Sequence, residues 1–98
     1  MNTYMLSFTS NTGTVTRQNI LDYLDTKREI LNWFAAMPFT IIIISKETHS
    51  KLSELLRNRF ANDITFLLTK TEPHAVDGFI NKQVWDFINN PKSSGRWE

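Results

Sequence analysis

The stretch MPFTIIIIS, residues 37–45, decides the fold of this chain. Pro38 disfavours a helical backbone at Met37, the residue before it, and has no amide hydrogen to donate within a helix. The isoleucines that follow Thr40 are β-branched and favour an extended strand. Because this run is apolar at every position, both faces of the strand must be covered. We therefore expect residues 39–45 to form a central strand of a sheet.

The residues before Pro38 admit two interpretations. By propensity alone, residues 30–37 could continue a helix that starts further upstream. The same residues can form a strand that pairs with residues 39–45 in a β-hairpin whose turn contains the proline. We favour the hairpin, with residues 30–36 as its first strand, and keep the helix as the alternative.

Towards the N-terminus, the sequence predicts one strand and one helix. Tyr4, Leu6 and Phe8 alternate with other residues, which is typical of a strand over residues 3–10. Thr14 or Thr16 can cap a helix that extends to about residue 27. Its apolar residues fall at helical spacing and are Ile20, Leu21 and Leu24.

Towards the C-terminus, Thr48 is placed to cap a second helix. The apolar residues on one face of this helix are Leu52, Leu55, Leu56 and Phe60. Alternation predicts a strand over residues 63–70, and a short amphipathic helix follows Gly78 and ends near Pro91. The apolar residues of that segment are Ile80, Val84, Phe87 and Ile88. Residues 92–98 are polar and are expected to form a mobile tail.

The predicted order is β-α-β-β-α-β, the arrangement of ferredoxin-like α+β domains. Residues 1–91 then form one domain, with a four-stranded antiparallel sheet, helices on one face and a C-terminal extension. The other face carries a pair of the isoleucines, Met5, Leu67 and either Trp33 or Phe34. This apolar surface is too large to be left in water, so we expect a homodimer in which these residues and Trp85 form the interface.

Composition excludes several classes of protein. The 98 residues carry a net charge of +1, so no strong long-range field marks a nucleic-acid or membrane binder. The absence of cysteine excludes disulfides, thiolate zinc sites and cysteine nucleophiles. No signal peptide or membrane span is recognised in the sequence, so a cytoplasmic protein without a membrane partner is expected.

A wider pattern of residues suggests a family. It comprises Tyr4 to Phe8, Trp33 ahead of Pro38 to Ile42, Asp63 to Leu68, Gly78 to Ile80, and Trp85 to Phe87. This pattern resembles small ferredoxin-like proteins related to the CRISPR-associated subunit that pairs in the spacer-integration complex. Similar proteins include the stand-alone SinR-like proteins and the ribonuclease called virulence-associated protein D. The resemblance implies a bacterial or phage origin.

The resemblance also implies a homodimer whose sheets face one another, often with C-terminal segments packed on the partner. In active members an aspartate at the end of the first strand of each protomer meets its counterpart at the dimer axis. There the pair helps to hold a divalent metal for phosphodiester cleavage. The matching residue here is Thr9, which has no anionic oxygen for magnesium. We therefore predict no metal site, no cofactor and no catalytic residue of this kind.

We expect the other polar residues to have ordinary structural or surface positions. Asp22 and Asp25 share one helix face, as expected of a solvated surface. The loop over residues 10–16 could hold an anion at the start of a helix, but an ordinary turn is the simpler interpretation. His49 and His74 lack neighbouring ligands at suitable spacing and are expected at the surface.

Basic residues around the two main helices are the candidates for nucleic-acid binding. They are Arg17, Lys46, Lys51, Arg57 and Arg59. Three functions stay open from the sequence. They are a nucleic-acid-associated relative of the ribonucleases without their metal site, a non-catalytic dimer that binds or inhibits another protein, and an anion binder that uses the threonine-rich loop.

Overall fold

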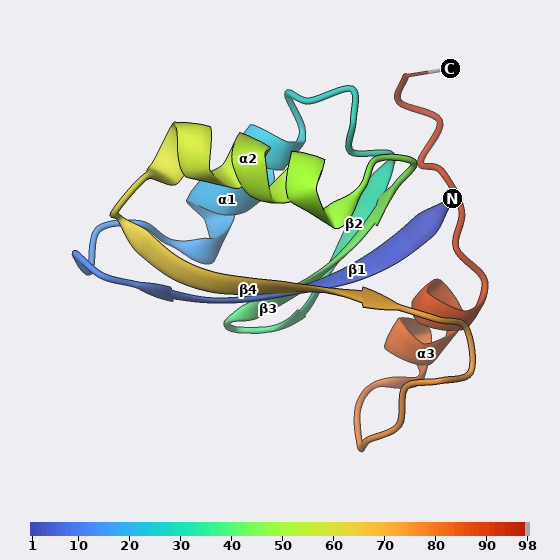
Figure 1. The fold of residues 1–98 in the computed structure, drawn as a ribbon. Helices are drawn as coiled ribbons and strands as arrows, with labels where there is room; N and C mark the ends of the chain where they lie inside the picture. Colours follow the sequence, from blue (N-terminus) through green and yellow to red (C-terminus); the bar gives the residue numbers. More distant parts are fainter. Residues whose placement is uncertain (98) are drawn as a thin grey trace.

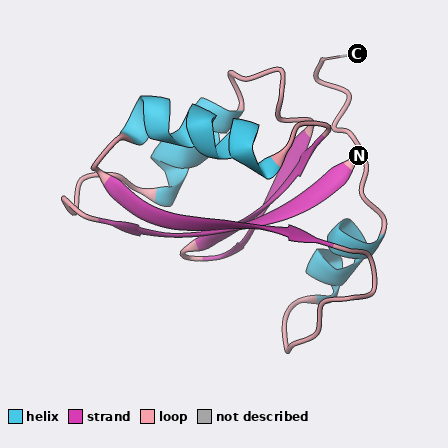
Figure 2. Cartoon of the chain, in the orientation of Figure 1, coloured by secondary structure: helices cyan, strands magenta, loops and turns pink. Residues whose placement is uncertain are grey.

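A computed structural model describes residues 1–97 of the chain (Figures 1 and 2). Its strands are β1 (Asn2–Ser10), β2 (Asn32–Met37), β3 (Thr40–Ser45) and β4 (Ile64–Thr71). Its helices are α1 (Arg17–Leu24), α2 (His49–Phe60) and α3 (Lys82–Asn89).

The strands form one antiparallel sheet in the order β2-β3-β1-β4. The isoleucine-rich strand β3 lies inside the sheet, where Ile43 is paired with Tyr4 of β1 and with Trp33 of β2. The α+β class and the four-stranded antiparallel sheet predicted from the sequence are confirmed, and the arrangement is compatible with a ferredoxin-like fold. The segment before Pro38 is a strand, as favoured.

The second strand begins later than predicted, because Ile30 belongs to the preceding turn. The backbone N–H of Ile30 donates to the carbonyl oxygen of Lys27 at 3.1 Å, and its side chain is buried in the core. The first helix is also shorter than predicted and ends at Leu24. Its capping residue, Asp25, starts the turns that lead into β2.

Helices α1 and α2 cover one face of the sheet (Figure 1). Thr16 caps α1 and shares a capping box with Asn19, and the Thr48 hydroxyl caps α2 by accepting from the N–H of Lys51. The core between the helices and the sheet includes Tyr4, Leu6, Phe8, Ile20, Ile41, Ile43, Leu52, Leu56 and Phe60. This layer places the alternate apolar residues of each strand as the sequence predicts.

Helix α3 packs on the opposite face of the sheet (Figure 1). Val84 and Ile88 of α3 are buried with Ile42 of β3, and the side chains around them include Met5 and Phe34. The chain itself therefore covers part of the apolar face that the sequence analysis assigned to a second copy. The face is left open towards the turn between β2 and β3.

The C-terminal tail contacts the domain, which differs from the free tail expected from its composition. The N–H of Ser94 donates to the Leu31 carbonyl oxygen at 2.9 Å, and the Trp97 indole Nε1 donates to the Ile30 carbonyl oxygen at 3.2 Å. Arg28 lies over the Trp97 ring, with its guanidinium carbon 5.6 Å from the ring centroid. These contacts close the tail over the turns between α1 and β2.

Candidate interaction surface

The residues predicted to form a dimer interface occupy three different places. Met5, Phe34 and Trp85 come together around α3 and pack within this chain. Trp33 lies on the helix-covered face, where its Nε1 donates to Asp25 Oδ1 at 2.7 Å. Leu67, in contrast, is 75% exposed in the middle of β4. Of the five, Leu67 is the exposed apolar side chain.

Leu67 belongs to a surface that we call the open-face patch, formed by Ser7, Thr9, Thr65 and Leu67. The register brings these residues together, because Ser7 is paired with Leu67 and Thr9 with Thr65. Phe39, in the turn before β3, is 61% exposed, but its ring packs edge-to-face on Phe8 of the helix-side core, with the ring centroids 5.9 Å apart, so Phe39 lies at the end of the sheet on the helix side. The patch is apolar at its centre, and the side chains around it are hydroxyl-bearing and uncharged.

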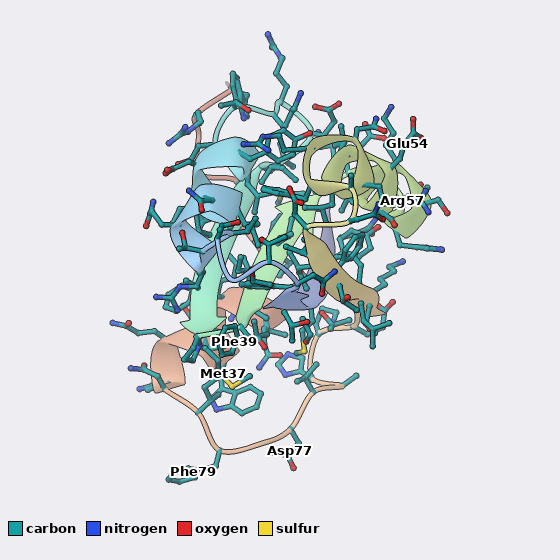
Figure 3. All side chains as sticks on the ribbon, turned by 90° about the vertical axis from the view of Figure 1, so that its left-hand side faces the viewer. Met37, Phe39, Glu54, Arg57, Asp77 and Phe79 are labelled. Atoms are coloured by element: carbon teal, nitrogen blue, oxygen red, sulfur yellow. The ribbon has the colours of Figure 1, made fainter. Side chains whose placement is uncertain are left out.

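A second exposed apolar group lies in the loop between β4 and α3. This loop folds under the open face, where Val76 and Ile80 pack with α3. Phe79 lies at its tip, fully exposed and directed away from the sheet, as Figure 3 shows. Met37, which is 45% exposed, lies between this loop and Phe39 (Figure 3). Exposed apolar side chains therefore also lie at the turn between β2 and β3 and at the tip of this loop.

The structure does not gather the candidate basic residues on one surface. The Arg17 guanidinium donates to the Met37 carbonyl oxygen at 3.1 Å, and Arg59 lies over the Phe60 ring at 5.0 Å. Arg57 is two residues from Arg59 on the same helix, so the two side chains point in directions about 200° apart. Arg57 lies beside β4, while Lys46 and Lys51 are exposed elsewhere.

The two aspartates of α1 and its cap have separate structural partners. Asp22 is exposed and accepts a hydrogen bond from Gln18 at 2.8 Å. Asp25 accepts from Trp33 and lies 3.6 Å from Arg96 of the tail. These contacts show that Asp25 links the end of α1 to β2 and to the tail, and that Asp22 belongs to a solvated helix surface.

The threonine-rich loop satisfies its own polar groups. The N–H of Gly13 donates to the Ser10 hydroxyl at 3.0 Å, and the hydroxyls of Thr12 and Thr14 are hydrogen-bonded to each other at 2.6 Å. Gly13 has a φ of 74°, which a residue with a Cβ rarely adopts. This geometry supports the ordinary-turn interpretation of the loop.

No cluster of three or more His, Cys, Asp or Glu side chains at metal-binding distance occurs among residues 1–97. His49 lies on the first turn of α2 beside β4, and the backbone N–H of His74 donates to Asn89 Oδ1 at 2.8 Å. Thr9, the residue that matches the metal-binding aspartate of the suggested relatives, lies exposed in the open-face patch opposite Thr65.

No family model matches the sequence, and no curated protein or solved structure matches it either. The resemblance to the CRISPR-associated proteins therefore stays a prediction that rests on the residues quoted for it. Within the described residues, no helix has the length and apolar character needed to cross a bilayer.

Sequence reasoning missed Phe39 and Phe79 as surface residues. The prediction from the sequence includes Phe39 in a strand that is covered on both faces, although Phe39 follows Pro38 and therefore falls in the hairpin turn. Turn residues lie at the surface because their backbone groups need solvent, and this signal could have separated Phe39 from the isoleucines. Phe79 follows the Asp77-Gly78 turn signal and could have been found in the same way.

Proposed function

We propose that this protein is an interaction module that forms a homodimer through the open-face patch. The observation that carries this proposal is the 75% exposure of Leu67 at the centre of a strand. Its neighbours on the sheet are the hydroxyl side chains of Ser7 and Thr65. A large apolar side chain exposed at such a position marks a contact surface.

A second copy of the chain suits this patch because none of its side chains is charged. Two identical uncharged patches can meet across a two-fold axis without bringing like charges together. The sequence resemblance supports the same place, because it implies a dimer axis near the residue that matches Thr9. Thr9 lies within the patch.

The expected dimer is of moderate affinity. Fully burying a leucine or phenylalanine side chain contributes roughly 1.5 to 3 kcal/mol. Association itself costs about 4 to 15 kcal/mol in lost freedom of motion, which burial of Leu67 alone does not offset. Contacts of Met37 and Phe79 with the second copy would add to the patch. We therefore expect self-association at micromolar concentration.

The experiment compares Leu67→Asp with Ser50→Asp. Both variants lower the net charge by one, but Ser50 is exposed on the first turn of α2, in the helical layer. Light scattering after gel filtration should give about twice the 11.5 kDa chain mass for the unchanged protein and for Ser50→Asp. Leu67→Asp should elute as a monomer with an unchanged circular dichroism spectrum.

Two results would overturn the proposal. One is a monomer at every concentration for the unchanged protein, and the other is a dimer that Leu67→Asp leaves intact.

Nucleic-acid association is the alternative function. Binding of labelled RNA or DNA by the monomer, weakened by Arg57→Gln, would favour that alternative over the interaction module.

A further inference from the structure

Strand β4 is an edge strand with a free row of backbone groups. The N–H of Asn11 donates to the Asp63 carbonyl oxygen at 2.8 Å, which fixes the hydrogen-bonding phase of the β1–β4 ladder. In an antiparallel pair the hydrogen-bonded positions alternate, so Thr65, Leu67 and Thr69 direct their backbone groups towards β1. The backbone groups of the residues between them therefore point outward from the sheet. These residues are Ile64, Phe66, Leu68 and Lys70.

The other edge of the sheet is protected by the chain itself. Strand β2 has a bulge between Phe34 and Met37, and the Arg17 guanidinium donates a hydrogen bond to the Met37 carbonyl oxygen. The tail also bonds near the start of β2, where Asn32 Nδ2 donates to the Lys92 carbonyl oxygen at 3.0 Å. Bulges and covering segments are common ways of blocking an edge strand. Strand β4 has a regular register throughout its length.

A groove of about 530 Å³ runs beside the β4 edge, under helix α2. Figure 1 shows α2 lying over this side of the sheet. One wall is β4, and the other includes His49, Ser53 and Arg57, which are spaced by four residues along α2. Arg57 is exposed, and no carboxylate is among the residues that line the groove. The groove thus combines unpaired strand backbone with one fixed positive charge.

We propose that the β4 edge and helix α2 bind an extended peptide of another protein, which joins the sheet as a fifth strand. The peptide backbone would pair with the outward groups of Phe66 and Leu68, as in other cases of strand addition. Side chains of a strand alternate between the two faces. Those on the helical side meet Arg57 and are acidic, and those on the other side lie beside Leu67 and are apolar.

The chemistry of the edge separates this partner from two others. A second copy of the chain would present its own β4, which contains Lys70 and no acidic residue, and so cannot complement Arg57. The phosphate groups of a nucleic acid accept hydrogen bonds but do not donate them, so they would leave the outward carbonyl groups of β4 without partners. An acidic and apolar peptide strand satisfies both the charge and the backbone groups.

This inference deepens the proposed interaction module but is centred on the β4 edge and Arg57, and it meets the open-face patch only at Thr65 and Leu67. The probe is a fluorescein-labelled peptide in which Glu alternates with Val. Its controls are a peptide in which Lys replaces Glu, and a Glu-Val peptide with N-methyl groups on the amides that would face β4. Affinity is measured by fluorescence anisotropy, and the dimer by light scattering in the same samples.

The matched variants are Arg57→Glu and Arg59→Glu, which change the net charge equally on one helix. Arg59 lies over the Phe60 ring and does not line the groove. Arg57→Glu should weaken binding of the Glu-Val peptide by about tenfold or more, since it replaces attraction by repulsion. Arg59→Glu should change the affinity by less than about twofold, as expected of a charge outside the site. Neither variant should alter the oligomeric state.

Amide hydrogen exchange supplies a readout specific to strand addition. Bound peptide should slow exchange at Phe66 and Leu68, whose N–H groups are free, and leave Thr65 and Leu67 slow as before. The inference is overturned by no binding of the Glu-Val peptide at millimolar concentration, by equal effects of the two variants, or by tight binding of the N-methylated or Lys peptide. Unchanged exchange at Phe66 and Leu68 with saturating peptide also overturns it. If the peptide binds with this pattern but light scattering finds no dimer, only the proposal that the open-face patch forms a homodimer is rejected.

Discussion

Asp25 joins three segments that are distant in the sequence. Its Oδ1 accepts the indole hydrogen of Trp33 at 2.7 Å and lies 3.6 Å from Arg96 of the tail. Its backbone carbonyl oxygen accepts a second hydrogen bond from the Arg96 guanidinium at 3.0 Å. One partly buried carboxylate therefore orients β2 and the tail relative to the end of α1.

We expect Asp25→Ala to destabilise the fold by about 1 to 3 kcal/mol, because the half-buried Trp33 Nε1–H loses its acceptor. Asp22→Ala is the matched control and should change the unfolding free energy by less than about 0.5 kcal/mol. Urea unfolding followed by circular dichroism measures both. Equal effects of the two substitutions would contradict the role given to Asp25.

The sequence could not distinguish these two aspartates. Their spacing places both on one helix face, but α1 ends at Leu24, so Asp25 already belongs to the turn. Which carboxylate meets Trp33 depends on the β2 register, which also decides that Trp33 and Phe34 face opposite layers. Register is a tertiary property that local propensity does not determine.

At the scale of elements, α3 covers part of the second sheet face. Its side chains Val84 and Ile88 are 2% exposed and pack on Ile42, which the sequence predicts to need cover. The amphipathic period of this segment predicts that one face is buried. It does not say against which layer, because both faces of β3 are equally apolar.

Ile88→Ala should lower the unfolding free energy by about 2 to 5 kcal/mol, since it leaves a cavity between α3 and the sheet. Phe79→Ala removes a larger side chain from the same C-terminal segment, but one that is fully exposed, so stability should hardly change. Thermal melts of dilute, monomeric protein compare them. A larger loss for Phe79→Ala would show that the loop packs elsewhere.

At the scale of the whole molecule, the tail closes the structure over the turns between α1 and β2. Composition predicted mobility because residues 92–98 are mostly polar. The tail nevertheless contains Trp97, whose ring lies against Arg28 and whose Nε1–H bonds to Ile30. A single aromatic residue at the end of a polar segment forms no repeating hydrophobic pattern. The sequence therefore could not predict which part of the domain Trp97 contacts.

Removing residues 92–98 should therefore lower the melting temperature. A loss of about 1 kcal/mol corresponds to roughly 4 to 8 °C in a domain of this size. Trp97→Ala in the full chain should reproduce much of the shift, whereas Lys92→Ala should not, since Lys92 contributes its carbonyl oxygen. Differential scanning fluorimetry tests this, and an unchanged melting temperature after truncation would restore the free-tail prediction.

The candidate surfaces were less predictable than the fold, for a similar reason. The sequence placed Leu67 on the face away from the helices, and the structure leaves it exposed there. The groove beside Arg57 depends on β4 being an edge strand, which follows from strand order and not from any property of the segment. Surfaces created by topology become visible only once all strands are placed.

The pairing of β1 with β4 also constrains how the protein is synthesised. Register joins Ser10 to Ile64 and Thr3 to Thr71, so β1 is synthesised well before the strand with which it pairs. Contacts between such distant residues form slowly. Until Thr71 has left the ribosome, a nascent chain with a β1–β3 pair would expose the unpartnered side of β1. During that interval β1 is the segment most open to mispairing with neighbouring chains or to capture by a chaperone.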